Sequence, residues 1–206
     1  DGIMYDKFIL SKGHACLAYY ASLSEVGFLS DEQLKTFEKN DTELPGHPVM
    51  NKKLGIEFST GSLGMGLSLG IGVAISLKKK NKDTNVFVIM GDGECNEGSI
   101  WESAMLAASN SLYNLTVLID FNKWQATGRS KEIMALDPLL DKWKSFGWHS
   151  QEIDGHDFNE IRNSLINAKN NKQKPSVIIA HTVKGKGISF MEDDNNWHYR
   201  TPNNEE

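Results

Sequence analysis

Val86-Phe-Val-Ile-Met-Gly-Asp-Gly93 is the stretch of this sequence that decides its fold. Its first five residues, Val86–Met90, are apolar without any polar alternation, and they stop at an aspartate between two glycines. Two more runs of this kind follow, Leu115–Ile119 and Ser176–Ala180. Strands that are apolar on both faces are typical of a parallel sheet covered by helices on both sides.

Helical patterns separate these runs. The segments expected to be helical are Leu63–Lys80, Ile100–Ser111 and Asp157–Asn171. The first contains glycines at 64, 66, 70 and 72, which indicate a very close neighbour. The last has apolar residues on one face and begins with Asp157, a typical helix cap. Strands alternating with helices predict an α/β fold, a parallel sheet with helices on both faces.

Composition favours one globular domain spanning residues 1–206, with a polar tail at 193–206 as a candidate flexible segment. The formal net charge of -5 gives no reason to expect nucleic acid or an anionic membrane as partner. No apolar run approaches the ~20 residues of a membrane span. Cys16 and Cys95 fit neither a zinc site nor a disulfide framework, which favours a cytoplasmic protein. The first residues show neither an initiator Met nor a signal segment, as expected if upstream residues are missing.

Two candidate metal ligands follow neighbouring strands of the predicted sheet. Asp92 comes after the first strand and Asn122 after the second. A right-handed crossover would bring both to the carboxyl edge of the sheet, where ligands gather. One carboxylate and one amide oxygen are too few for calcium but suit Mg²⁺, which keeps positions open for phosphate and water. Gly91 and Gly93 would let a phosphate approach the backbone, and the helix start near Gly98 would add free N–H groups.

A Gly-Asp-Gly after a strand is by itself usually a tight turn. Its spacing to Asn122, however, makes it informative about a ligand site. Gly91-Asp-Gly93, then 28 residues, then Asn122 resembles the thiamine-diphosphate signature, with the spacing of transketolases. Further motifs that resemble this family in the same order are Leu10-Ser-Lys-Gly-His14, Pro45-Gly-His47-Pro, Ser59-Thr-Gly61-Ser-Leu63-Gly-Met-Gly66, Gly91-Asp-Gly-Glu-Cys-Asn-Glu97-Gly98-Ser-Ile-Trp-Glu102, Asp154-Gly-His156-Asp, Lys184-Gly-Lys-Gly187 and Trp197-His198. The resemblance covers nearly the whole chain and implies the thiamine-diphosphate-binding fold, in its diphosphate-type domain.

The resemblance also implies roles for individual residues. Mg²⁺ would be held by the side chains of Asp92 and Asn122 and by the backbone carbonyl of Trp124. Thiamine diphosphate would be contacted by His14, Gly61, Ser62, Leu63, Gly93, Asn122 and His198. The family often has proline at the position of Ser62. The expected catalytic residues are His14, His47 and His198, since imidazoles can donate to phosphate and exchange protons with sugar hydroxyls near neutral pH.

Other polar residues have plainer interpretations. His149, His156 and His181 are expected to be surface or satisfied core residues. Glu97 and Glu102 lie at the start of a predicted helix, where the helix dipole alone accounts for acidic side chains. In proteins of the transketolase type, however, these positions lie at the subunit contact beside the active site. We therefore expect them at an interface.

The family places its activating carboxylic acid in a pyrimidine-binding domain, for which this sequence has no counterpart up to Glu206. The chain thus resembles the N-terminal subunit of a split transketolase, active only with a C-terminal subunit. The expected assembly is a heterotetramer about a two-fold axis, moving a two-carbon ketol unit between a ketose and an aldose, both expected as phosphorylated sugars. An upstream histidine motif of the family is absent, which leaves the substrate open. The alternatives are a deoxyxylulose-phosphate-synthase-like condensation, a split thiamine enzyme acting on a specialised sugar, and a non-catalytic assembly subunit.

Overall fold

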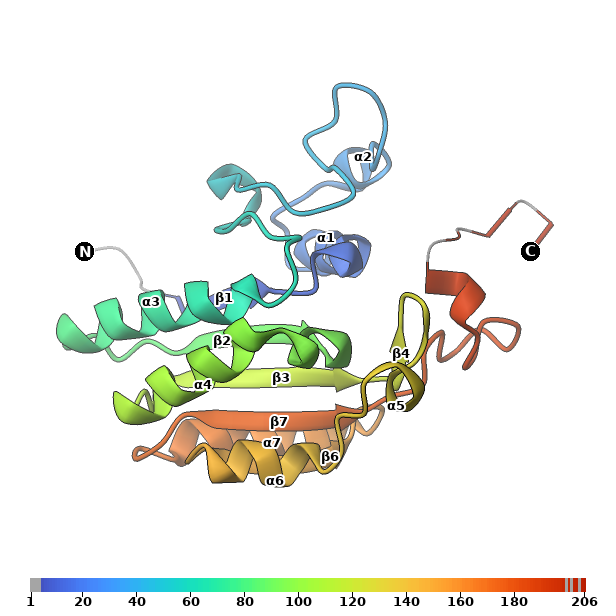
Figure 1. The fold of residues 1–206 in the computed structure, drawn as a ribbon. Helices are drawn as coiled ribbons and strands as arrows, with labels where there is room; N and C mark the ends of the chain where they lie inside the picture. Colours follow the sequence, from blue (N-terminus) through green and yellow to red (C-terminus); the bar gives the residue numbers. More distant parts are fainter. Residues whose placement is uncertain (1–4, 199, 201, 204) are drawn as a thin grey trace.

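A five-stranded parallel sheet forms the centre of the molecule (Figure 1). The computed structural model describes residues 5–198, 200, 202–203 and 205–206. The strand order is β1-β2-β3-β7-β6, and each neighbouring pair is parallel. The strands are β1 (Lys7–Leu10), β2 (Val86–Gly91), β3 (Leu115–Phe121), β6 (His149–Asp154) and β7 (Ser176–His181). The predicted parallel α/β fold is therefore confirmed.

The sequence pattern did not predict the two edge strands. Strand β1 is only four residues long, and β6, His-Ser-Gln-Glu-Ile-Asp, is mostly polar. Both pair on one side only, β1 with β2 and β6 with β7. An edge strand is partly exposed to solvent, so it does not need the continuous apolar run that identifies a central strand.

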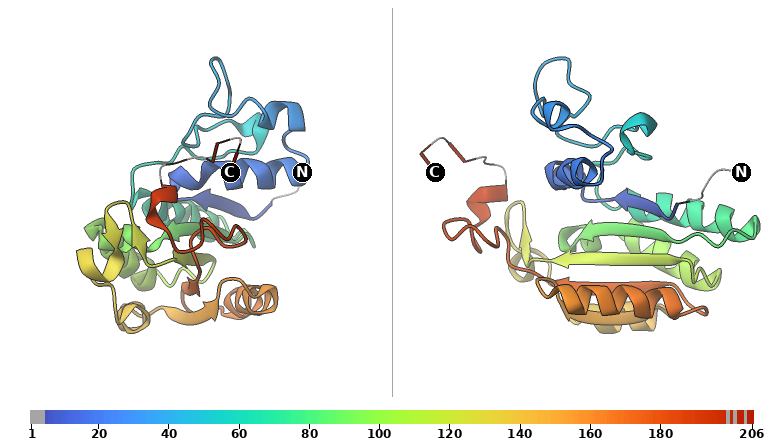
Figure 2. Two further views of the ribbon diagram at one scale, coloured as in Figure 1. Left: turned by 90° about the vertical axis from the view of Figure 1, so that its right-hand side faces the viewer. Right: turned by 180° about the vertical axis from the view of Figure 1, so that it is seen from behind.

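Helices cover both faces of the sheet, as expected. Figure 2 shows α7 on the face opposite to α3 and α4. The helices are α1 (Cys16–Glu25), α2 (Asp31–Leu34), α3 (Met65–Lys79), α4 (Gly98–Ser109), α5 (Ser130–Ile133), α6 (Leu139–Ser145) and α7 (Phe158–Asn170). The three predicted helices, which correspond to α3, α4 and α7, lie within two residues of these bounds. Asp157 caps α7 through its side chain, which accepts from the amides of Asn159 and Glu160.

The main core lies between the sheet and the helices α3, α4 and α6. Helix α3 approaches the sheet so closely that a Cβ on Gly70 would lie 2.7 Å from Cγ2 of Val88. A Cβ on Gly66 would meet the side chain of Ser11 even more closely. At these two positions the close neighbour predicted from the glycines is therefore part of the chain's own sheet layer. A Cβ on Gly72, by contrast, would meet nothing within 4 Å.

Three features flank the sheet. A second apolar cluster packs α1 and α2 with the segment around Leu44–Ile56, beyond the edge of β1. A two-stranded hairpin, β4 (Trp124–Gln125) and β5 (Gly128–Arg129), follows β3 at its carboxyl end. The C-terminal segment lies beside this hairpin and contains a 3₁₀ turn, Asn195–His198. The predicted tail, 193–206, lies partly outside the described residues, and its flexibility stays a prediction. None of the helices in the described ranges is long and apolar enough to cross a membrane.

Candidate functional site

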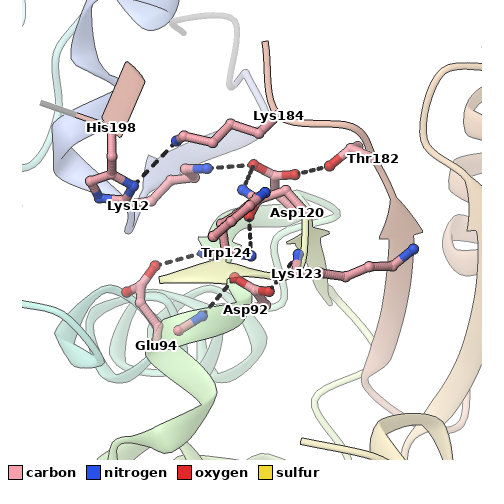
Figure 3. A network of polar contacts seen from close by, with 12 residues as sticks. Lys12, Asp92, Glu94, Asp120, Lys123, Trp124, Thr182, Lys184 and His198 are labelled. Carbon is pink, nitrogen blue, oxygen red and sulfur yellow. Dashed lines mark hydrogen bonds and ion pairs between the residues drawn. The ribbon is translucent and has the colours of Figure 1, made fainter. Parts of the chain in front are cut away.

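The candidate metal ligands lie at the carboxyl ends of two adjacent strands, β2 and β3, and Figure 3 shows two of them, Asp92 and Trp124. In the β2–β3 register Gly91 is the partner of Asp120, so Asp92 and Asn122 each follow their strand at the same edge of the sheet. The amide of Lys123 donates to Oδ2 of Asp92 at 2.9 Å, which joins the two strand ends directly. The predicted crossover thus brings the two segments together.

Asp92 is a buried carboxylate surrounded by neutral donors. Asp92 is only 1% exposed. Besides the amide of Lys123, it accepts from the amide of Gly93 at 2.8 Å and from Oγ of Ser130 at 3.0 Å. Burial raises its pKa to about 6, while these hydrogen bonds oppose the rise. A carboxylate in such surroundings gains strongly from a bound cation.

Asn122 and Trp124 form the second part of the same edge. Oδ1 of Asn122 accepts from the amide of Trp124 at 2.9 Å, and its Nδ2 donates to Oδ2 of Asp120 at 3.2 Å. Oδ1 keeps a second lone pair for a ligand. Among the described residues, no group of three or more His, Cys, Asp or Glu side chains could hold a metal ion. A cation here would therefore need amide and backbone oxygens beside the single carboxylate, which is the donor set of Mg²⁺.

A network of charged side chains above this edge was not predicted from the sequence. Asp120 accepts hydrogen bonds from Nζ of Lys12 and Oγ1 of Thr182 (Figure 3). Burial opposes ionisation of Asp120, but Lys12 and the hydrogen bonds outweigh it and hold its pKa below the usual value. Burial, followed by the charge of Lys12, lowers the pKa of Lys184. The Lys12 and Lys184 positions belong to motifs recognised in the sequence, but only the fold shows that they face one another across the strand ends.

Two of the predicted histidines lie together beside this network. The rings of His14 and His198 stack with centroids 5.2 Å apart, and Nδ1 of His198 lies 3.2 Å from Nζ of Lys184. Burial, then the positive charge of Lys12, lowers the pKa of His14 to about 4. Burial and Lys184 also lower the pKa of His198. Both imidazoles are therefore held in the neutral form near neutral pH.

His47 and the glycine loop approach the same place from another direction. A Cβ on Gly61, which has a φ of 150°, would lie 3.0 Å from Cδ2 of His47. A Cβ on Gly13 would lie 2.8 Å from the Cα of Gly61, so the two loops meet backbone to backbone. The next two residues, Ser62 and Leu63, are exposed. The structure thus brings the predicted Gly61–Leu63 loop and all three predicted catalytic histidines to one end of the sheet.

Glu94 braces these loops, and sequence reasoning missed it. Its buried carboxylate accepts from Oγ of Ser11 at 2.5 Å, from the amide of Gly64 at 3.0 Å and from the amide of Gly91 at 2.8 Å. It therefore ties together the end of β1, the start of α3 and the end of β2. Burial raises its pKa. The sequence pattern carried no signal for this role, because the three partners are brought together only by the fold.

One buried polar atom beside Gly93 lacks a partner. Nε2 of Gln125 makes no hydrogen bond within the described part of the chain. The same side chain lies 3.4 Å from where a Cβ on Gly93 would be. Buried donors are rarely left unsatisfied. An unpaired donor next to a glycine at a strand end is what a site for an anionic ligand would provide.

Of the other histidines that the sequence singled out, His149 begins β6, whereas His181 ends β7 as the register partner of Phe121 and therefore lies close to the strand-end site. His149, His156 and His181 have hydrogen-bond partners within the chain, Ser176, Val183 and Glu152 respectively. A cleft of about 600 Å³ adjoins the last two, on the β6 side of Lys123. Glu97 and Glu102 are exposed at the start of α4, as a contact with another chain would require.

Comparison with known proteins gives a consistent result. The family model described as the transketolase thiamine diphosphate binding domain matches residues 3–206. The 6-deoxy-6-sulfo-D-fructose transketolase subunit SqwG of Clostridium sp. is 44% identical over 91% of this chain and 68% of its own length. An apulose-4-phosphate transketolase subunit of Actinobacillus succinogenes is 43% identical over 98% of this chain and 72% of its own length.

Larger relatives match over a smaller share of their length. Human transketolase is 38% identical over 94% of this chain but only 30% of its own length. The crystal structure of transketolase from Campylobacter jejuni superimposes with a TM-score of 0.85 and 31% sequence identity, covering 93% of this chain and 31% of that one. The chain therefore corresponds to about a third of these larger proteins.

Proposed function

This chain belongs to the transketolase family, whose thiamine diphosphate binding domain it carries, and from that premise we propose a Mg²⁺ and diphosphate site at the ends of β2 and β3. Asp92 and Asn122 would ligate the metal by their side chains and Trp124 by its carbonyl. The observation that carries this proposal is the buried carboxylate of Asp92, whose pKa is raised and whose hydrogen-bond donors are all neutral. A divalent cation would offset its burial.

The diphosphate of the cofactor would bind between the strand ends and the loops above them. Gly93 and the Gly61–Leu63 loop would contact it through the backbone, and His14 and His198 through their rings. The unpaired Nε2 of Gln125 supports this position, since it could donate to a phosphate oxygen.

We further propose that the protein transfers a two-carbon ketol unit from a ketose to an aldose. Thiamine diphosphate, when bound, supplies the electron sink for this chemistry. The contribution of this chain would be to orient the substrate and to move protons at its hydroxyl groups. His47 and His198 are proposed for that task, and so is His14 through hydrogen bonds, since its lowered pKa, about 4, keeps its ring neutral at pH 7, where one ring nitrogen donates and the other accepts a hydrogen bond.

The proposed substrates are sugars with an anionic group. Two relatives are named for 6-deoxy-6-sulfo-D-fructose and for apulose 4-phosphate, which carry a sulfonate and a phosphate. These names favour a specialised sugar over the general pentose and hexose phosphates. They also favour ketol transfer over a deoxyxylulose-phosphate-synthase-like condensation or a purely structural role.

We propose that the active enzyme contains a second kind of subunit. Relatives covered over about 70% of their length are named as subunits of transketolases. A pyrimidine-binding subunit would complete the site, in a heterotetramer with a two-fold axis. The exposed Glu97 and Glu102 are proposed to contact it. Large apolar side chains are also exposed on α3 and α4 and just before α3, namely Leu63, Met65, Leu69, Met105 and Leu106. We also propose a cytoplasmic location, which is consistent with two free, buried cysteines.

Titration calorimetry tests the proposed site. Thiamine diphosphate should bind the assembled enzyme only when Mg²⁺ is present, and Asp92→Ala should abolish this binding. Asp141→Ala, which removes an exposed carboxylate on α6, is the matched control and should bind as the wild type does. Circular dichroism would establish that both variants are folded. Undiminished binding by Asp92→Ala would overturn the assignment of the site.

A coupled assay tests the reaction. The chain together with its partner subunit should produce ketol transfer from at least one sulfonated or phosphorylated ketose, and the chain by itself should produce none. Ketol transfer by this polypeptide alone would contradict the proposed need for a second subunit.

A further inference from the structure

The segment 183–198 carries two residues of the site, Lys184 and His198, yet it projects beyond the carboxyl end of the sheet (Figures 1 and 2). It is closed on itself, because the amide of Asp193 donates to the carbonyl of Lys184 at 2.8 Å. Nζ of Lys184 also lies 3.2 Å from Nδ1 of His198. These contacts fix the two site residues relative to each other, so their position over the strand ends depends on what holds the segment to the body of the domain.

Asp193 attaches the segment to the body of the domain through an ion pair with Arg129. Its carboxylate receives two hydrogen bonds from the Arg129 guanidinium, Nη1 to Oδ1 at 2.7 Å and Nη2 to Oδ2 at 2.5 Å. Nε1 of Trp124 donates to the same Oδ1 at 2.9 Å. The hydrogen bonds from Arg129, then that from Trp124, lower the pKa of Asp193 to about 2. Such bidentate pairs fix direction as well as distance.

Arg129 is oriented by its own hairpin. Trp124 and Arg129 are paired across β4 and β5, and the guanidinium lies 3.7 Å from the centroid of the indole ring. Stacking on the indole leaves the guanidinium few alternative orientations, which reduces the entropy lost when it binds Asp193. A second bond from the same segment, from Nδ2 of Asn195 to the carbonyl of Ala126 at 3.2 Å, reaches the loop of this hairpin.

Trp124 also belongs to the metal edge of the site. Its amide donates to Oδ1 of Asn122 at 2.9 Å, while its indole donates to Asp193. The main chain of this one residue is thus part of the loop that would hold the metal, and its side chain is part of the attachment of the segment that carries His198. A change in the position of the metal loop can therefore reach the segment that carries His198 through Trp124 alone.

We propose that Trp124, Arg129 and Asp193 form a latch that positions His198 and Lys184 over the diphosphate site and couples their placement to metal binding. The coupling rests on the proposed function, in which the carbonyl of Trp124 ligates Mg²⁺. The three residues are positioning residues, since none of their side chains is assigned a contact with cofactor or substrate. Binding of metal at the Asn122–Trp124 loop fixes the hairpin, and the latch transmits this order to 184–198.

Amide hydrogen exchange of the assembled enzyme tests the latch directly. The variant Asp193→Asn keeps the shape of the side chain and tolerates the φ of 58° at this position. In this variant we expect the protection factors of residues 184–198 to fall by about fivefold, the scale of one partly exposed ion pair. Adding Mg²⁺ and thiamine diphosphate should then raise these protection factors only slightly. The matched control is Asp141→Asn, which removes the charge of another exposed aspartate, 3.5 Å from Lys144. It should leave exchange in 184–198 unchanged.

Two further variants separate the parts of the latch. Trp124→Phe keeps the main chain and an aromatic face for Arg129 but removes the indole donor, so it should lose part of the protection. Asp193→Glu restores the carboxylate and should recover protection relative to Asp193→Asn. Turnover of Asp193→Asn should fall by about tenfold, with an unchanged melting temperature.

The outcomes are distinguishable. Protection of 184–198 in Asp193→Asn within twofold of the wild type, with and without cofactor, would refute the latch. If the wild type binds Mg²⁺ and thiamine diphosphate without any gain of protection in this segment, the coupling is refuted. If the wild type binds no cofactor, the proposed function fails, while the comparison of cofactor-free proteins still decides whether Asp193 holds the segment.

Discussion

The buried carboxylate of Asp92 makes the stability of the metal-free protein depend on pH in a defined window. Its pKa rises from the ordinary 3.8 to about 6 because of burial. Well below 3.8 the carboxyl group is protonated in both the folded and the unfolded chain. Between these two values the unfolded chain releases the proton and the folded chain keeps it. Stability contributed by this group therefore falls as pH rises through the window and is constant above it.

The size of the effect follows from the same two values. The gap between 3.8 and about 6 corresponds to about 3 kcal/mol in the free energy of unfolding. The variant Asp92→Asn cannot titrate at this position. The difference in unfolding free energy between the variant and the wild type should thus shift in favour of the variant by about 2 kcal/mol from ~pH 4 to ~pH 7, where most of this gap is crossed. Other titrating groups cancel in this difference.

Urea denaturation followed by circular dichroism, with EDTA present, measures this difference at each pH. Excess Mg²⁺ should then stabilise the wild type above pH ~6, where Asp92 is ionised, and should not stabilise Asp92→Asn. If the difference in unfolding free energy between the two proteins changes by less than ~0.5 kcal/mol across the whole pH range, the raised pKa is refuted. Equal stabilisation of both proteins by Mg²⁺ would show that the metal binds elsewhere.

Two other predictions concern the site and the core. Alanine at His47 or His198 should lower turnover by ~10²–10⁴-fold in a steady-state assay with little change in melting temperature, and losses of only a few-fold in both variants would remove them from catalysis. Gly70→Ala should lower the free energy of unfolding by ~1–3 kcal/mol, because its Cβ would lie 2.7 Å from Cγ2 of Val88. Gly72→Ala should raise the free energy of unfolding by up to ~1 kcal/mol, because its Cβ would have nothing within 4 Å. Urea titrations of this chain measure both changes. Equal effects of the two glycine substitutions would contradict the close packing of α3 on the sheet.

The central part of the fold could be predicted from the sequence because burial on both faces leaves a strong pattern. Val86–Met90 is apolar throughout and Leu115–Ile119 is apolar except for the buried Thr116, since helices cover both sides of β2 and β3. Strand β6 could not be found in this way, because an edge strand with a polar face has no such requirement. Gly66 and Gly70 of α3 correctly indicated a close neighbour and Gly72 did not, and sequence alone could not tell the chain's own sheet from another subunit.

Topology alone predicted only the part of the site where the candidate ligands follow strands directly, and the histidines and the Gly61–Leu63 loop were predicted from motifs. Asp92 and Asn122 each come immediately after a buried strand, so their shared edge follows from topology. Glu94 and Asp120 act through partners from distant parts of the chain, such as Ser11 and Lys12, which no local pattern connects. The roles of the predicted ligands and histidines remain predictions, although the fold brings all of them to one end of the sheet.

The charges at this end of the sheet suggest an order of binding. Asp92 and Asp120 oppose Lys12 and Lys184, and the lowered pKa of His14, about 4, leaves its ring neutral at pH 7. The four charged groups sum to about zero, in a protein whose formal net charge is -5. An anionic diphosphate would therefore gain no net attraction from these four groups by themselves. A divalent cation at Asp92 would change the local charge by +2, so metal binding should come before, or together with, the diphosphate.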